Sequence, residues 1–186
     1  MSLAKPGPDA IPGEWIARMA PRSIVFACAN PVPEIYPSEA KAAGAYIVAT
    51  GRGDFPNQVN NSVCFPAILK GTLLVHAKAI SDSMAIAAAH SIADFAEARG
   101  ISTEDIIPKM NETEMFPKVA ADVAVQACKE GLARNPMSWE EAYEATRRDI
   151  AEVRSMMGLL TEKGQIPPID PQWLQEALDW AVAQIG

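Results

Sequence analysis

The feature that most constrains this sequence is a pair of apolar runs, each of which ends in asparagine. The first run, residues 23–29, stops at Asn30, and a proline follows. The second run, residues 46–50, leads through a glycine-containing loop to Asn60 and Asn61, where an apolar helical pattern begins. In an open parallel sheet, ligands bind where strands end and helices begin. The sequence therefore predicts one crevice shared by both polar strand ends.

The residues between and around these runs predict a β-α-β unit. The first run shows no polar alternation, which is typical of a strand buried on both faces in a parallel sheet. Pro37 and Gly44 fit the start and the end of a short helix at residues 38–43. The interval between the two strands is just long enough for a parallel crossover.

Helical patterns dominate the remaining sequence. Start and stop residues predict helices at residues 9–16, 61–73, 81–99, 116–133, 138–157 and 170–185. In the second of these we expect a bend at Gly71 and a buried face made of Val63, Phe65, Ile68, Leu69 and Leu73. The first helix is expected to hold Trp15, Ile16 and Met19 on one side.

The last predicted helix carries an apolar stripe. Two tryptophans flank it, and its residues are Trp173, Leu174, Leu178, Trp180, Ala181 and Ile185. A contiguous apolar patch of this kind usually marks an interface, so we expect it to pack against a domain outside this chain or a second subunit. Packing on the core of this chain remains the open alternative.

Composition excludes several classes of function. The 186 residues carry a net charge of −7, with 16 basic and 23 acidic side chains well mixed, which argues against nucleic-acid binding. The apolar segments are too short to span a membrane, and no secretory signal is visible. Three widely separated cysteines form no Cys-x-x-Cys pair, so neither a zinc site nor a disulfide framework is indicated, and a reducing cytoplasmic setting is expected.

A complete dinucleotide-binding fold needs a glycine-rich turn, and no Gly-x-Gly-x-x-Gly occurs here. The nearest match has Gly51 and Gly53 but places Pro56 where the third glycine belongs, and proline does not allow the same close helix packing. These glycines are expected to shape a loop. The sequence is therefore interpreted as a large piece of a bigger fold.

Two segments, Ala29–Glu34 and Ala49–Asn61, closely resemble the nicotinamide-binding domain of malic enzymes, particularly the short bacterial and archaeal type. The resemblance runs from Pro6 to about Arg134 and is looser in the helical tail. It departs from the short-form pattern at Gly53, where relatives commonly have serine. The resemblance implies an α/β fold that is part of a Rossmann-like, doubly wound parallel sheet, followed by a helical C-terminal region.

The same resemblance implies a division of the chain into two parts. It also implies an activity for the full-length enzyme to which the chain would belong, which is called the parent below. Residues 1–134 would be the C-terminal part of the NAD(P)-binding domain, and residues 135–186 a helical extension. The parent would oxidatively decarboxylate (S)-malate to pyruvate and CO₂ while reducing NAD or NADP, as a cytoplasmic homodimer. The choice between NAD and NADP depends on a residue outside this chain.

The metal and the catalytic groups of the family are expected elsewhere. The family's catalytic lysine and tyrosine and the acidic ligands of Mg²⁺ or Mn²⁺ belong to segments that precede this chain. No catalytic residue and no metal ligand is therefore assigned here, and the isolated chain is expected to be inactive.

Three asparagines are the candidate site residues. By resemblance, Asn30 contacts both cofactor and substrate, Asn60 contacts the cofactor near the nicotinamide, and Asn61 contacts the malate carboxylate. An amide suits this task because it offers two donors and an acceptor without a charge to desolvate. Asn61 is also expected at a helix N-terminus, where free amides attract a carboxylate. From the residues alone, a turn role for Asn30 and a helix-cap role for the other two stay open.

Other readings remain. Glu34 and Asp54 are expected to be solvated or to brace loops, and Arg52 to brace its loop or to meet an anion.

The chain as a whole has two rival interpretations: a non-catalytic remnant or assembly module that binds a partner chain, and a different dehydrogenase with similar strand ends.

Overall fold

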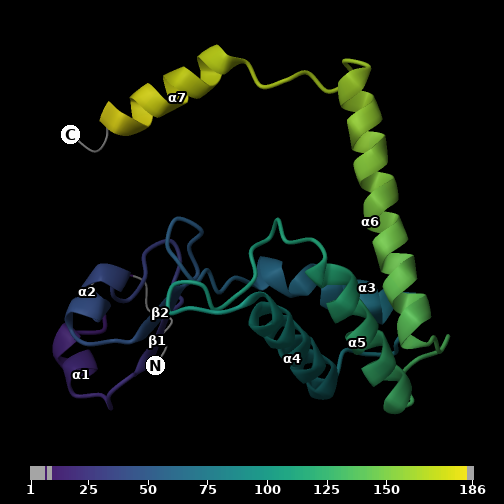
Figure 1. Cartoon of the computed structure of the whole chain (residues 1–186), viewed down its shortest axis with the longest axis horizontal. Helices are drawn as coiled ribbons and strands as arrows, with labels where there is room; N and C mark the ends of the chain where they lie inside the picture. The colour runs from purple at the N-terminus through teal and green to yellow at the C-terminus, as the bar shows by residue number, and fades with distance from the viewer. Residues whose placement is uncertain (1–6, 8–9, 184–186) are drawn as a thin grey trace. The chain divides into compact units, whose positions relative to one another are not determined.

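The computed structural model describes Gly7 and residues 10–183 (Figure 1). They form two short parallel strands and seven α-helices with one 3₁₀ helix, in the order α1 (Gly13–Ala17), β1 (Ile24–Ala27), α2 (Pro37–Ala42), β2 (Ile47–Thr50), η1 (Asn61–Val63), α3 (Phe65–Leu74), α4 (Asp82–Arg99), α5 (Met115–Lys129), α6 (Trp139–Glu162) and α7 (Pro171–Ala183). This confirms the expected fold class, a small parallel sheet followed by a helical region. The chain divides into two compact units, Met1–Thr146 and Arg147–Gly186. The predicted domain boundary after residue 134 stays a prediction.

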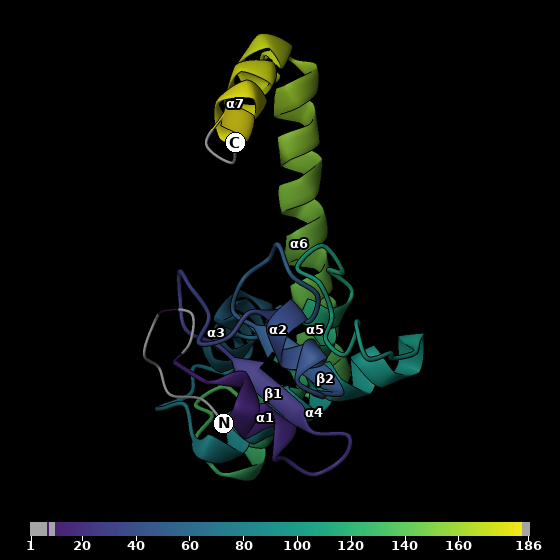
Figure 2. The same cartoon turned by 90° about the vertical axis from the view of Figure 1, so that its left-hand side faces the viewer.

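The predicted β-α-β unit forms the first half of unit 1. β1 and β2 pair in parallel, with Ile24 opposite Ile47 and Ala27 opposite Thr50. α2 connects them and packs beside β2, close to α1 (Figure 2). Gly44 ends the α2 turn with a φ of 105°, which glycine adopts without strain. The strands and these two helices share a small apolar core.

Burial in the β-α-β unit is one-sided, which corrects the prediction for β1. Val25 and Ala27 of β1 are buried, but Ile24 and Phe26 are 47% and 37% exposed. The apolar run therefore does not produce a strand buried on both faces within this chain, because the two-stranded sheet has helices enough to cover only one face. Ile16 of α1 is buried, whereas Trp15 and Met19, which follows the helix, are exposed.

The second half of unit 1 is a helical core. α3, α4 and the start of α6 pack around α5, whose buried residues include the predicted Val119, Val123 and Ala127. Ser81 caps α4 by accepting a hydrogen bond from the Met84 amide at 3.2 Å. Such a cap removes one orphan amide and fixes where the helix begins.

Gly71 has a role in packing that was not predicted. α3 runs unbroken from Phe65 to Leu74, and Gly71 lets it approach α5 closely. A Cβ atom at Gly71 would lie 2.3 Å from the Ala120 carbonyl oxygen and 2.9 Å from Val123 Cβ. This contact decides which face of α3 is inside: Ala67 and Gly71 are buried. The predicted buried residues Phe65, Leu69 and Leu73 are 52%, 40% and 67% exposed.

α6 and α7 begin as the sequence predicts. Ser138 and Glu141 form the expected capping box at α6, with hydrogen bonds of 3.2 Å and 2.7 Å. Asp170 accepts from the Gln172 amide at the start of α7. No residue of α7 is buried, and Trp173 and Trp180 are 68% and 69% exposed. The last predicted member of its stripe, Ile185, lies outside the described residues.

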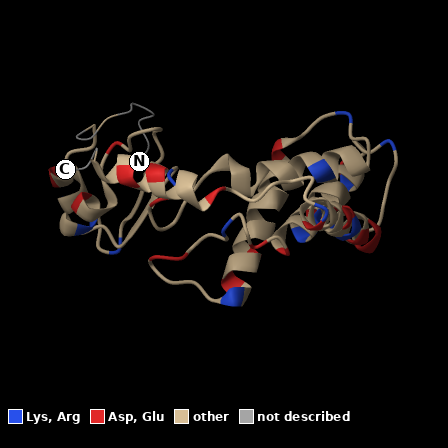
Figure 3. Cartoon of the chain, turned by 90° about the horizontal axis from the view of Figure 1, so that it is seen from above, with Lys and Arg blue, Asp and Glu red and all other residues tan. Residues whose placement is uncertain are grey.

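Charged residues of both signs are interspersed along the described part of the chain (Figure 3). None of the helices in residues 10–183 combines the length and the apolar composition needed to cross a membrane.

Candidate functional site

The carboxyl ends of β1 and β2 bring two of the three candidate asparagines to one place. Asn30 follows β1 and Gly51 follows β2, so both lie at the same edge of the sheet. A Cβ atom at Gly51 would lie 2.9 Å from Asn30 Nδ2. On the other side, Asn60 Nδ2 donates to the Gly51 carbonyl at 3.2 Å. The side chains of Asn30 and Asn60 therefore meet the same glycine.

Asn60 is held by the scaffold through both ends of its amide. Its Oδ1 accepts a hydrogen bond from the Ser62 amide at 3.0 Å, so it caps η1. The helix-cap alternative thus describes one end of this side chain. One Nδ2 hydrogen remains for a ligand, because an amide nitrogen has two donors and Gly51 uses one.

Asn61 differs from Asn60 in its surroundings. Its side chain is exposed, and it starts a single 3₁₀ turn. The α-helix begins only at Phe65. Asn61 thus lies at the N-terminus of a helix, as expected, but this helix is the short 3₁₀ turn η1 that precedes α3.

An apolar hollow lies beside the asparagine pair. It has a volume of about 520 Å³, and Asn60 and Asn61 line it together with apolar residues of β1, α3 and α4 that include Phe26, Ile68 and Ile92. Mostly apolar walls with a few convergent polar groups are typical of small-molecule sites.

Arg52 joins the two strand-end loops. It donates to the Pro31 carbonyl at 3.0 Å, in the loop after β1. It also donates twice to Asp54, at 2.8 Å and 2.6 Å, and this hydrogen bonding holds the pKa of the Asp54 carboxyl below its ordinary value. Of the two roles considered for Arg52, bracing the loop is the one the contacts show.

Glu34 braces the loop after β1 from inside. Its side chain is fully buried, and its Oε2 accepts from the Ala29 amide at 3.0 Å, directly before Asn30. Cys28 lies close by, and its thiol pKa is raised by burial first and by the Glu34 carboxylate second. Glu34 is therefore a buried structural group and not a solvated one.

Asn57 was not predicted as a site residue, yet its side chain is buried and links the loop to two other segments. It is 5% exposed and forms three hydrogen bonds with main-chain groups of β2 and of the segment after α4. The only sequence signal is an asparagine after a proline, which indicates a turn and gives no partner.

The segment after α4 is held by an ion-pair network around Arg99. Arg99 donates to both carboxylate oxygens of Asp105, at 2.5 Å and 2.8 Å, and also contacts Glu112 at 3.1 Å. The hydrogen bonds from Arg99 lower the pKa of the Asp105 carboxyl.

We predict a pH-dependent effect of Asp105→Asn. Because the folded-state pKa lies below the unfolded value, the ion pair stabilises the fold above the unfolded pKa and loses this effect as pH falls through the folded pKa. The variant should therefore be less stable at neutral pH, by about 0.2–1 kcal/mol for a partly exposed pair. Urea unfolding at pH 7 and below pH 3 measures this. A deficit that is equally large in acid would contradict it.

The described residues offer no site for a metal ion. Across Gly7 and residues 10–183, no group of three or more His, Cys, Asp or Glu side chains is arranged to hold one. His76 and His90 are both exposed. The residues present therefore do not fit a divalent cation, and no chemical step through a metal is derived from this chain.

Comparisons with known proteins agree on one family. The family model "Malic enzyme, NAD binding domain" matches residues 14–131. The chain is 44% identical over 139 residues to a bifunctional malic/malolactic enzyme of Bacillus subtilis, covering 75% of this chain and 34% of that protein. The crystal structure of a malic enzyme from Entamoeba histolytica matches all of this chain and 38% of its own, with 54% identity and a TM-score of 0.95.

A malic enzyme from Pyrococcus horikoshii also matches, with 46% identity and a TM-score of 0.80 over 86% of this chain and 36% of its own. The chain thus spans between 34% and 38% of the length of these relatives. The family match covers more than half of the described sequence and includes both strands and all three asparagines. The chain therefore belongs to the malic enzyme family, as part of its NAD-binding domain.

Proposed function

We propose that this chain is the C-terminal part of the nucleotide-binding domain of an enzyme that oxidatively decarboxylates (S)-malate to pyruvate and CO₂ and reduces NAD or NADP. The observation that carries the proposal is the meeting of Asn30 and Asn60 at Gly51, beside the apolar hollow that Asn60 and Asn61 line. Relatives are named both NAD-dependent and NADP-dependent malic enzymes, so both cofactors stay in the proposal.

The residues present suit the nicotinamide end of the cofactor and the substrate. Asn30 and the remaining Nδ2 hydrogen of Asn60 would hold the carboxamide side of the nicotinamide, and Asn30 and Asn61 would hold malate. Neutral amide donors would hold the nicotinamide and malate in a fixed position relative to each other, which hydride transfer from malate C2 requires. The bound dinucleotide supplies the hydride acceptor.

Two other parts that this reaction needs, a phosphate-binding turn and a set of metal ligands, are not found in this chain as far as the sequence and the described residues show. No glycine-rich phosphate turn occurs in the sequence, and no metal-ligand cluster occurs in the part of the chain the structure describes. We propose that the cation, the catalytic acid and base, and the phosphate turn belong to segments outside this chain. The isolated chain should then show no malate-dependent NADH or NADPH formation.

Asn61→Ala tests the substrate role in the full-length enzyme. Loss of a donor to a charged carboxylate should cost about 1–3 kcal/mol in transition-state stabilisation, seen as a higher KM for malate or a lower kcat. Steady-state kinetics with varied malate measures both. Asn135→Ala is the matched control, because Asn135 is exposed and lies after α5, away from the strand ends. Unchanged kinetics for Asn61→Ala would remove this residue from the site.

We further propose that the apolar faces of α6 and α7 contact a second copy of the chain in a homodimer. Support comes from the exposure of their large apolar residues in this chain, namely Val153, Met156, Met157, Leu159, Leu160, Trp173, Leu174, Leu178, Trp180 and Val182. An exposed set of this size is typical of an interface. Packing of these faces on the core of this chain is the alternative to this proposal.

Leu178→Glu is the test of the dimer. A charge in the centre of the stripe should weaken self-association of the full-length enzyme by at least about tenfold, because a buried unpaired carboxylate is costly. Sedimentation velocity over a concentration series measures this, with Gln175→Glu on the same helix as the control. A monomeric wild type, or a dimer indifferent to Leu178→Glu, would assign the stripe to another segment of the same polypeptide.

A cytoplasmic setting is part of the proposal. It is supported by the three cysteines, all of which are free. Of the two rivals, the assembly module is favoured only by the exposed apolar stripe, and a different dehydrogenase is not supported by the family match.

A further inference from the structure

Asn57 combines a left-handed backbone conformation with a side chain whose two donor hydrogens and acceptor oxygen all form hydrogen bonds. Its φ is 56°, in the left-handed region that asparagine tolerates better than most residues. Its Nδ2 donates to the Val48 carbonyl at 3.0 Å and to the Thr103 carbonyl at 2.8 Å, and its Oδ1 accepts from the Ile106 amide at 2.9 Å. The side chain thus links β2 with a segment more than 40 residues away.

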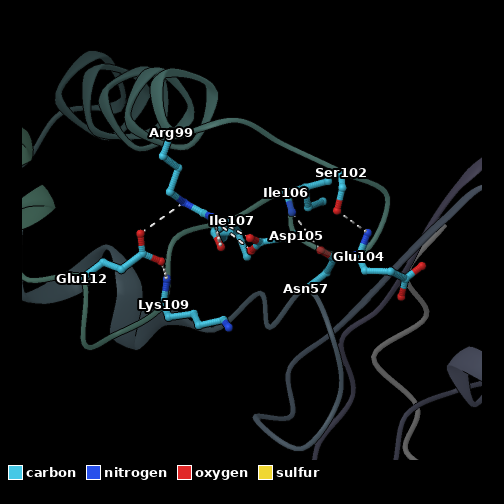
Figure 4. A network of polar contacts seen from close by, with 9 residues as sticks. All are labelled: Asn57, Arg99, Ser102, Glu104, Asp105, Ile106, Ile107, Lys109 and Glu112. Atoms are coloured by element: carbon cyan, nitrogen blue, oxygen red, sulfur yellow. Dashed lines mark hydrogen bonds and ion pairs between the residues drawn. The ribbon is translucent and has the colours of Figure 1, made fainter.

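That distant segment is itself well anchored. Figure 4 shows Asn57 next to Ile106, with Arg99 reaching from the end of α4 to Asp105 and Glu112. Arg99 also donates to the Ile107 carbonyl at 3.1 Å. Asn57 is therefore attached to a rigid group and not to a loose loop.

The main chain of Asn57 leads directly to the candidate site. Its carbonyl accepts from the Thr50 amide at 3.3 Å, and the Thr50 carbonyl accepts from the Val59 amide at 2.7 Å. These bonds close the loop between Gly51 and Gln58, and Asn60 is the next residue after Val59. The position of Asn60 and Asn61 thus depends on where Asn57 holds the loop.

We propose that Asn57 is a positioning residue that fixes the Asn60–Asn61 pair relative to β2. This proposal rests on the proposed function. No other residue type reproduces the arrangement: aspartate would face two carbonyls with a carboxylate, alanine would strain the left-handed backbone, and glycine would keep the backbone but lose all three bonds.

The test is Asn57→Gly in the full-length enzyme, alone and combined with Asn60→Ala and Asn61→Ala together. A loss of positioning at this distance costs up to about 100-fold in kcat/KM, and we expect at least about a tenfold decrease for the single variant. Because Asn57 acts through the Asn60–Asn61 pair, adding Asn57→Gly to the Asn60→Ala/Asn61→Ala variant should lower kcat/KM for malate by less than about twofold. Asn135→Gly is the control and should leave kcat/KM unchanged.

The outcomes separate this proposal from the proposed function. A wild type without malate-dependent turnover overturns the function. An active wild type in which Asn57→Gly lowers kcat/KM by the same factor with and without the Asn60→Ala/Asn61→Ala pair, or an Asn57→Gly variant with normal kcat/KM, overturns only the positioning role. If Asn57→Gly does not fold, Asn57→Asp goes through the same cycle, since it keeps the acceptor for Ile106 and loses both donors. Failure of both variants to fold assigns Asn57 to stability alone and also overturns the proposal.

Discussion

Gly71→Ala should destabilise the protein by about 3 kcal/mol, although the change adds a single methyl group. In a helix, alanine is normally better than glycine by about 0.5–1 kcal/mol. At Gly71, however, the new Cβ would lie 2.3 Å from the Ala120 carbonyl oxygen, a backbone atom that cannot move alone. α3 and α5 would have to separate, and overpacking of this kind in a core costs about 1–3 kcal/mol or more.

The control for this prediction is Gly158→Ala. Gly158 also lies inside a helix, α6, but a Cβ there would meet nothing within 4 Å. The same substitution should therefore leave stability unchanged or raise it by about 0.5–1 kcal/mol. Urea midpoints from circular dichroism compare the two variants with the wild type. Equal midpoints for both variants would show that α3 and α5 are not in close contact.

Gly51→Ala should have the opposite effect from Gly71→Ala. It should lower the activity of the full-length enzyme and leave the stability of the fold nearly unchanged. A Cβ at this position would lie 2.9 Å from Asn30 Nδ2 and 3.3 Å from its Oδ1. The end of an exposed asparagine side chain moves easily, so the fold is expected to change by less than about 0.5 kcal/mol. The displaced amide would no longer reach its ligands, and misplacing a positioning group costs up to about 100-fold in kcat/KM.

The matched control for Gly51 is Gly53→Ala, two residues along the same loop. A Cβ there would meet only the Gln58 side-chain amide, at 3.2 Å. The amide end of the Gln58 side chain can move aside, so a small side chain should fit at Gly53. We expect kcat/KM within about twofold of the wild type. If Gly53→Ala loses as much activity as Gly51→Ala, the loop as a whole and not the amide at Asn30 is sensitive.

Local signals in the sequence predicted where most elements begin. Ser81 and Ser138 mark helix starts because each hydroxyl accepts a hydrogen bond from a backbone amide of the first turn that has no partner within the helix. Pro37 marks a start because proline has no amide hydrogen that would need a partner there. Neither effect needs a distant partner. The sequence also identified the asparagines as candidate site residues, because they follow two strands and the ends of parallel strands share one edge of a sheet. The resemblance to malic enzymes supplied their expected roles.

Long-range contacts explain what the sequence did not predict. The buried face of α3 was assigned to its largest apolar residues, but the close approach at Gly71 places the small residues inside. Asn57 was missed because its partners, Thr103 and Ile106, lie 46 and 49 residues away. A single sequence carries no sign of such pairs. The one-sided burial of β1 also depends on distant contacts, because only the face of Val25 and Ala27 joins the core shared with α1 and α2.

The most direct test of the proposed site is a crystal structure of the full-length enzyme with NAD and an unreactive malate analogue bound. We expect side-chain amide atoms of Asn30, Asn60 and Asn61 at about 2.7–3.2 Å from the nicotinamide carboxamide or the analogue carboxylate. Ligands bound at another edge of the sheet, with all three amides facing solvent, would contradict the assignment of these residues.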